Sequence, residues 1–117
     1  MIPVLEPANQ QEAYQMTRYG FELSEIKGLP VMLRITTRLA HSRSGVERAP
    51  SLQQNDLRLP GDLTQFILLP SLARKRYRML LESQQGLMEE TDRSGFNWIE
   101  EGEDRSLGIV ACGIAYN

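Results

Sequence analysis

A strand–helix–strand pattern at the start of the 117-residue chain constrains the fold more than any other feature. The segment "IPVLEP" (residues 2–7) is a short apolar run closed by proline, which predicts a strand. The segment "LPVMLRITTRL" (29–39) is apolar and β-branched at its start, and predicts a second strand. Strand, helix and strand with short joins indicate a βαβ unit, in which the strands are parallel and the crossover right-handed. The fold class is therefore predicted to be α/β.

The segment between the two strands carries helix signals at both of its ends. Asn9, followed three positions later by Glu12, resembles a capping box with asparagine in place of serine or threonine. Gly28 is placed to end the helix in a left-handed conformation. Between these ends, four residues at helical spacing form one apolar stripe: Ala13, Met16, Gly20 and Leu23.

The middle of the chain predicts one further helix. Residues 44–62 are polar and contain two prolines and two glycines, which is typical of a linker or an irregular excursion. After the apolar segment "FILLP" (66–70), a second helix begins near Ser71, and only Gly86 weakens it. The basic residues lie mostly opposite its expected apolar face, which comprises Ala73, Tyr77, Leu80, Leu81, Gln84, Leu87 and Met88.

The C-terminal part predicts strands. A short strand is expected around Trp98, which should pack in a core or between domains together with Phe96. The segment "LGIVACGIAY" (107–116) consists of small and β-branched residues and predicts a longer strand. Its residues Gly108 and Gly113 predict that another element approaches this backbone closely. Cys112 lies within the same apolar run and is expected to be buried.

Composition excludes several classes of protein. A formal net charge of -2 gives no reason to expect binding to nucleic acid or to a membrane. One cysteine and one histidine are too few for a structural zinc site or an iron–sulfur cluster held by this chain, so no metal ligand is assigned. The start lacks the features of a signal peptide, and no apolar stretch approaches the ~18 residues of a membrane span. We therefore expect a cytoplasmic protein.

The segment that follows the second strand is the candidate site. Thr37, Arg38, His41, Ser42 and Arg43 lie at the carboxyl end of a parallel strand, where open α/β sheets bind ligands. Arginine pairs with carboxylates and phosphates through two hydrogen bonds, so Arg38 or Arg43 can hold an anionic group, and His41 can donate a proton near neutral pH. The alternative is that these residues cap the strand, pair with acidic neighbours or contact a partner. No residue is assigned a catalytic role.

A second cationic cluster, "ARKRYR" (73–78), has two interpretations. It resembles a nucleic-acid patch with an interleaved tyrosine. On an amphipathic helix of an acidic chain, we favour the solvated face.

Three stretches resemble one family. "PVLEPANQQEAYQMTRYGFELSEIKGLPVMLRITTRLAHSR", "LLPSLARKRYRMLLE" and "GIVACGIAY" are similar to the interior of the alpha subunit of indolepyruvate:ferredoxin oxidoreductase, a thiamine-diphosphate-dependent enzyme. The resemblance implies that residues 1–43 are the C-terminal βαβ part of a thiamine pyrimidine-binding-type domain. It implies that residues 44–65 are a linker. Residues 66–117 would then be a connecting helix and the first strand of a transketolase-C-like domain, so that the chain is an internal segment of a larger protein.

The resemblance also implies a reaction. The family decarboxylates arylpyruvates oxidatively to acyl-coenzyme A, with ferredoxin as the electron acceptor. Its cofactors are thiamine diphosphate, Mg²⁺ and 4Fe–4S clusters, with coenzyme A as acyl acceptor, and its partners are the rest of the alpha subunit, a beta subunit and ferredoxin. The family's thiamine-activating glutamate lies upstream of the similar region, and its diphosphate–magnesium motif lies downstream. Gly61–Asp62 should not be mistaken for that motif.

We therefore expect the chain to bind no cofactor and to be inactive alone. Two alternatives stay open: a standalone small α/β binding or assembly module, and the same enzyme class acting on another 2-oxoacid.

Overall fold

A computed structural model describes all residues from 1 to 117. The chain forms two compact units, which are described separately. The sheet unit comprises Ile2–Arg48 and Trp98–Asn117, and the helical unit comprises Met1 and Ala49–Asn97. The domain boundaries implied by the family resemblance stay a prediction.

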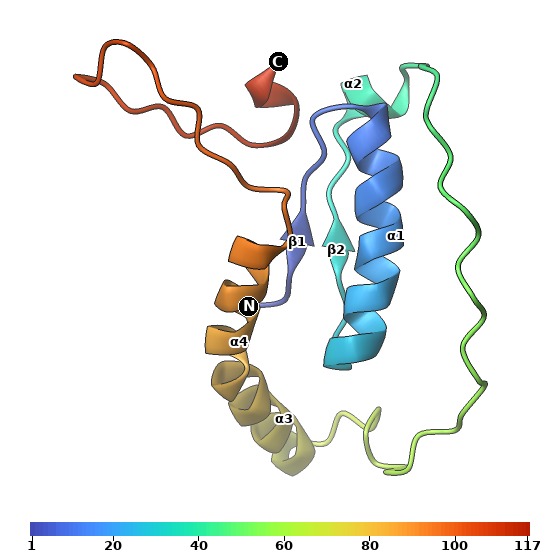
Figure 1. The fold of residues 1–117 in the computed structure, drawn as a ribbon. Helices are drawn as coiled ribbons and strands as arrows, with labels where there is room; N and C mark the ends of the chain where they lie inside the picture. The colour runs from blue at the N-terminus through green and yellow to red at the C-terminus, as the bar shows by residue number, and fades with distance from the viewer. The chain divides into compact units, whose positions relative to one another are not determined.

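The sheet unit contains the predicted pair of parallel strands (Figure 1). Strands β1 (Val4–Leu5) and β2 (Met32–Leu33) pair with Val4 opposite Met32. Backbone bonds from the Met32 N–H to the Pro3 carbonyl (2.9 Å) and from the Arg34 N–H to the Leu5 carbonyl (2.8 Å) flank the ladder. The parallel βαβ arrangement is confirmed, although both strands are shorter than the sequence predicts. The molecule is thus mixed helix with a small parallel sheet, which is consistent with the α/β class.

Helix α1 (Gln10–Lys27) begins and ends at the predicted residues. The Asn9 side chain accepts a hydrogen bond from the Glu12 N–H at 2.9 Å, and the Glu12 carboxylate accepts one from the Ala8 N–H at 2.8 Å. This is the reciprocal capping box, which satisfies two backbone donors that the helix itself leaves unpaired. Gly28 ends the helix at a φ of 61° and donates its N–H to the Ser24 carbonyl. The local signals for this helix are confirmed.

The core of the sheet unit lies where α1 meets the strands and the segment after β2. Met16 and Leu23 are its buried residues from the helix. Gly20 faces the strands, because a Cβ placed there would lie 3.5 Å from Leu5 Cδ1 and 3.6 Å from Val31 Cγ1, which is ordinary contact. The other buried hydrophobic residues are Pro7, Ala8 and Leu39. Burying a side chain the size of Leu23 or Met16 contributes about 1.5–3 kcal/mol, so this small core is held by few residues.

The prediction that residues 29–39 form one strand is wrong at its carboxyl end. The chain leaves β2 after Leu33 and forms a single helical turn, α2 (Thr37–Ala40). The Thr36 hydroxyl accepts a hydrogen bond from the Leu39 N–H at 3.4 Å, and the turn buries Leu39. A β-branched threonine favours a strand, but its hydroxyl can also cap the N-terminus of a helix. Here the capping hydrogen bond determines the structure.

The helical unit contains the predicted helix as two segments, α3 (Pro70–Glu82) and α4 (Gln84–Arg93). They meet at Ser83, whose hydroxyl donates to the Leu80 carbonyl at 2.9 Å in competition with regular helix bonding. Part of the expected apolar face is half-buried, namely Ala73, Leu80, Gln84 and Leu87. The expectation is wrong for the rest, because Tyr77, Leu81 and Met88 are exposed.

The C-terminal segment is not the predicted strand. Residues 107–112 form no regular element, and a short 3₁₀ helix, η1 (Gly113–Tyr116), follows them. Leu107, Ile109 and Val110 are exposed, since no other strand pairs with them. Cys112 is also exposed, which corrects its expected burial.

The two glycines of this segment behave differently. Gly113 is buried against Glu6, as a close approach requires, whereas nothing lies near Gly108. No strand forms around Trp98. Its half-exposed ring meets the Tyr116 ring edge-on, with 5.2 Å between the centroids.

Candidate functional site

A cavity of about 350 Å³ lies in the sheet unit, at the carboxyl end of the strands. It is formed by the start of α1, by α2 with the residue that follows it, and by the C-terminal segment. Its lining residues are Ala8, Asn9, Gln10, Arg38, Leu39, Ser42, Ile114 and Asn117. The volume falls at the lower end of the range for small-molecule sites, roughly 300–1,000 Å³. The lining combines apolar side chains with amide, hydroxyl and guanidinium groups, which suits a small ligand with an anionic end.

The cavity includes two of the five residues that the sequence proposes for the site. Arg38 lines it from α2 and makes no ion pair, so its charge is available to an anion. Ser42 accepts a hydrogen bond from the Gln10 amide at 2.5 Å and donates to the Leu39 carbonyl at 2.8 Å. These two contacts fix the Ser42 hydroxyl at the rim of the cavity.

The other three proposed residues, Thr37, His41 and Arg43, do not line the cavity. All five proposed residues are exposed, so it is the lining of the cavity, not burial, that separates Arg38 and Ser42 from these three. Thr37 contributes its carbonyl, which accepts a bond from the His41 N–H at 3.1 Å. The structure thus separates the two arginines proposed as anion ligands, with Arg38 at the cavity and Arg43 outside it.

An ion pair that the sequence interpretation missed joins the carboxyl ends of the two strands. Arg34 Nη2 lies 3.1 Å from Glu6 Oε1, and the Glu6 side chain is only 15% exposed, against 64% for Arg34. Each residue comes directly after a strand, and parallel strands bring their carboxyl ends to the same edge of a sheet. The position of each residue directly after a predicted strand is the sequence signal that could have revealed the pair.

The N-terminus of α1 is not open to an anion. The Glu12 carboxylate already accepts from the Ala8 N–H and places a negative charge at the first turn of the helix. A second anion there would be repelled, although the helix dipole alone would favour it. The positive group at the cavity is therefore the Arg38 side chain.

The C-terminal segment forms a second polar contact within the sheet unit. Asn117 donates from its side chain to the Ala8 carbonyl at 2.7 Å, and Tyr116 donates from its hydroxyl to Glu100 at 2.6 Å. The hydrogen bond to the Glu100 carboxylate, followed by desolvation, raises the pKa of Tyr116 above its ordinary value of 10.0. These contacts hold η1, and with it Ile114, at the cavity.

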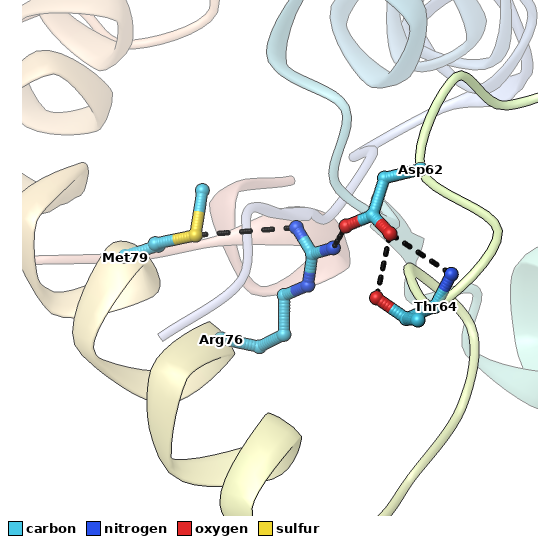
Figure 2. A network of polar contacts seen from close by, with 4 residues as sticks. All are labelled: Asp62, Thr64, Arg76 and Met79. Atoms are coloured by element: carbon cyan, nitrogen blue, oxygen red, sulfur yellow. Dashed lines mark hydrogen bonds and ion pairs between the residues drawn. The ribbon is translucent and has the colours of Figure 1, made fainter.

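Asp62 lies in the helical unit and accepts hydrogen bonds from Thr64 and Arg76 (Figure 2). One carboxylate oxygen accepts from the Thr64 N–H at 2.9 Å and from the Thr64 hydroxyl at 2.6 Å. The other accepts from Arg76 at 2.6 Å. The side chain and backbone of Thr64, and then Arg76, hold the pKa of Asp62 below its ordinary value of 3.8.

These contacts bear on the cofactors that the family resemblance implies. The oxygens of Asp62 are committed to Thr64 and Arg76, so Gly61–Asp62 does not fit a diphosphate–magnesium motif. The structure contains no group of three or more His, Cys, Asp or Glu side chains that could hold a metal ion.

Comparison with known proteins identifies the relatives. The chain is 40% identical to indolepyruvate oxidoreductase subunit IorA of Thermococcus kodakarensis and to that of Pyrococcus abyssi, in each case over 98% of its length. It is 37% identical to the IorA subunit of Methanothermobacter thermautotrophicus over 99% of its length. The chain is homologous to a segment of subunit IorA. The resemblance to the indolepyruvate oxidoreductase alpha subunit is confirmed.

The match covers only part of each IorA subunit. The chain spans 19% of the length of each of these IorA subunits. No protein-family model matches the chain, and no solved structure matches it. No helix of the structure combines the length and the apolar character needed to cross a membrane.

Proposed function

We propose that this chain forms part of an indolepyruvate oxidoreductase and that its cavity binds the carboxylate end of the 2-oxoacid. The observation that carries the proposal is the unpaired Arg38 at the cavity of a chain homologous to IorA. Its guanidinium would pair with the substrate carboxylate through two parallel hydrogen bonds. The side chains of Leu39 and Ile114 would contact the apolar part of the substrate.

The parts of the reaction divide between this chain and the rest of the enzyme. By the resemblance, thiamine diphosphate, Mg²⁺, the 4Fe–4S clusters and the site for coenzyme A belong to other parts of the alpha subunit and to a beta subunit, and ferredoxin takes up the electrons. This chain would bind and orient the substrate. The Gln10–Ser42 hydrogen bond supports that role, because it fixes a polar wall beside Arg38.

A chimeric enzyme tests the proposal. In Thermococcus kodakarensis IorA, the matched segment is replaced by this chain, and indolepyruvate-dependent reduction of a redox dye is measured in the assembled enzyme. The chimera should keep activity within about tenfold of the parent. Within it, Arg38→Gln should raise the KM for indolepyruvate roughly tenfold to a hundredfold, because a hydrogen bond to a charged group is worth about 1.5–3 kcal/mol.

Arg43→Gln is the matched control, since Arg43 is exposed like Arg38 but does not line the cavity. Its KM should stay within about twofold of that of the chimera, a change near the limit of what a lost surface charge produces. Equal KM values for the two variants would contradict the role of Arg38. A correctly assembled but inactive chimera would instead favour a separate binding or assembly role for the chain.

A further inference from the structure

The outward face of α3 carries a mixed cationic and apolar stripe that the proposed function does not use. Arg74, Tyr77, Arg78 and Leu81 follow one another at the spacing i, i+3, i+4 and i+7, which places them side by side on one helix face. All four are exposed, with 62% of Tyr77 and 50% of Leu81 accessible to solvent. We call these four residues the α3 stripe. They lie on the helix labelled α3 in Figure 1.

The charges of the stripe are unbalanced within the protein. Arg74 and Arg78 are like charges at i and i+4, an arrangement that destabilises a helix. Neither arginine makes an ion pair, and neither does Lys75 beside them. Arg76 differs, because its side chain reaches Asp62 and pairs with it (Figure 2). The stripe therefore holds unpaired cations that the stability of the helix does not explain.

The apolar members of the stripe distinguish it from an ordinary solvated face. Such a face consists of polar residues, whereas Tyr77 and Leu81 stand between and beside the two arginines with about half or more of their area exposed. Arginine and tyrosine are, with tryptophan, enriched at the energetic centres of protein interfaces. Carboxylates are the groups that arginine binds most strongly, through paired hydrogen bonds.

We propose that the α3 stripe docks an acidic segment of a partner protein, with partner carboxylates on Arg74 and Arg78 and an apolar partner side chain between Tyr77 and Leu81. Nucleic acid fits less well, because the chain carries a net charge of -2 and the stripe offers only two arginines. A membrane surface fits less well too, because it requires a continuous apolar face rather than one interrupted by arginine. This proposal is independent of the substrate proposed for the cavity.

Fluorescence anisotropy with the whole 117-residue chain tests the docking surface. The probe is a short labelled peptide of glutamate and leucine, and its twin has glutamine at every glutamate position. The acidic peptide should bind at low salt, and the twin should bind at least about tenfold more weakly because it lacks the carboxylates. The double variant Arg74→Glu with Arg78→Glu should lose at least about tenfold in affinity for the acidic peptide.

Three further variants test whether net charge or misfolding, rather than the stripe itself, explains a loss of binding. The variant Arg48→Glu with Arg58→Glu changes the charge equally at exposed positions outside α3, and its affinity should change by less than about threefold. Tyr77→Ala should weaken binding roughly tenfold, whereas Tyr77→Phe should keep most of it, because the ring supplies the apolar contact. Circular dichroism should show unchanged helix content in each variant.

Four results would overturn the proposal. The first is no binding of the acidic peptide, and the second is an equal loss of affinity in the Arg48/Arg58 variant. The third is tighter binding of a single-stranded oligonucleotide than of the peptide, and the fourth is tighter binding of anionic phospholipid vesicles than of the peptide. The last two would assign the stripe to nucleic acid or to a membrane surface.

Discussion

One carboxylate, that of Asp62, ties the segment before α3 to the helix itself. It accepts two hydrogen bonds from Thr64 and one from Arg76, so its charged form is favoured and its pKa lies below 3.8. The hydroxyl of Thr64 is the largest of these influences, ahead of the charge of Arg76. Hydrogen bonding to the charged form, rather than the ion pair, therefore dominates the shift.

These contacts give a prediction for two variants. Thr64→Val removes the hydroxyl donor and should raise the pKa of Asp62 toward 3.8, and Arg76→Met, which removes the cation, should raise it as well. Carbon-13 NMR titration of the Asp62 carboxyl group measures both values. An unchanged pKa of Asp62 in Thr64→Val would contradict the proposed cause.

The same shift has a consequence for the pH dependence of stability. Because the pKa of Asp62 is lower in the folded chain than in the unfolded one, its contribution is present above about pH 3.8 and is lost as the pH falls through the folded value. Thr64→Val should move that loss to higher pH.

At the scale of elements, η1 depends on one glycine. Gly113 has a φ of 55°, and a Cβ placed there would lie 2.5 Å from Cγ of Glu6, too close for any real contact. Gly113→Ala should therefore destabilise the docking of η1 by about 1–2 kcal/mol from the left-handed backbone alone, with the clash in addition. Hydrogen exchange of residues 113–117 is the measurement, and exchange should be faster in the variant.

Gly108→Ala is the control for this prediction. Gly108 has no positive φ and no neighbour within 4 Å of an added Cβ, so alanine there should leave the exchange of η1 unchanged. If both variants exchanged alike, neither the backbone conformation of Gly113 nor its contact with Glu6 would determine how η1 docks.

The elements also show which structure is predictable from a sequence. Helix α1 follows the prediction because Asn9, Glu12 and Gly28 act through residues near them in the chain. The strand predicted at 107–116 is absent because a strand depends on a distant partner, and β-branched composition alone does not supply one. The same distinction applies to the cavity. Arg38 and Ser42 follow from their position after β2, whereas Asn117 reaches the cavity from the other end of the sequence.

For the molecule as a whole, exposed apolar residues determine whether the isolated chain is stable and stays monomeric. Few hydrophobic side chains are buried, and the segment 107–111 leaves Leu107, Ile109 and Val110 exposed in a chain without a third strand. An exposed apolar segment that contains β-branched residues and has no strand partner can pair with another chain. We therefore expect the isolated chain to be marginally stable and to self-associate through this segment.

Ile109→Lys tests that expectation, because a charge in such a segment opposes strand pairing. Sedimentation velocity should show association only at a several-fold higher protein concentration, while circular dichroism should show unchanged helix content, since Ile109 lies outside every helix. Gln53→Lys, at an exposed polar position, adds the same charge and should leave association as it is in the original chain. If the two lysine variants behaved alike, net charge would explain the effect and the 107–111 segment would not be the contact. A monodisperse original chain with a cooperative, high-temperature transition would contradict the expectation for the whole molecule.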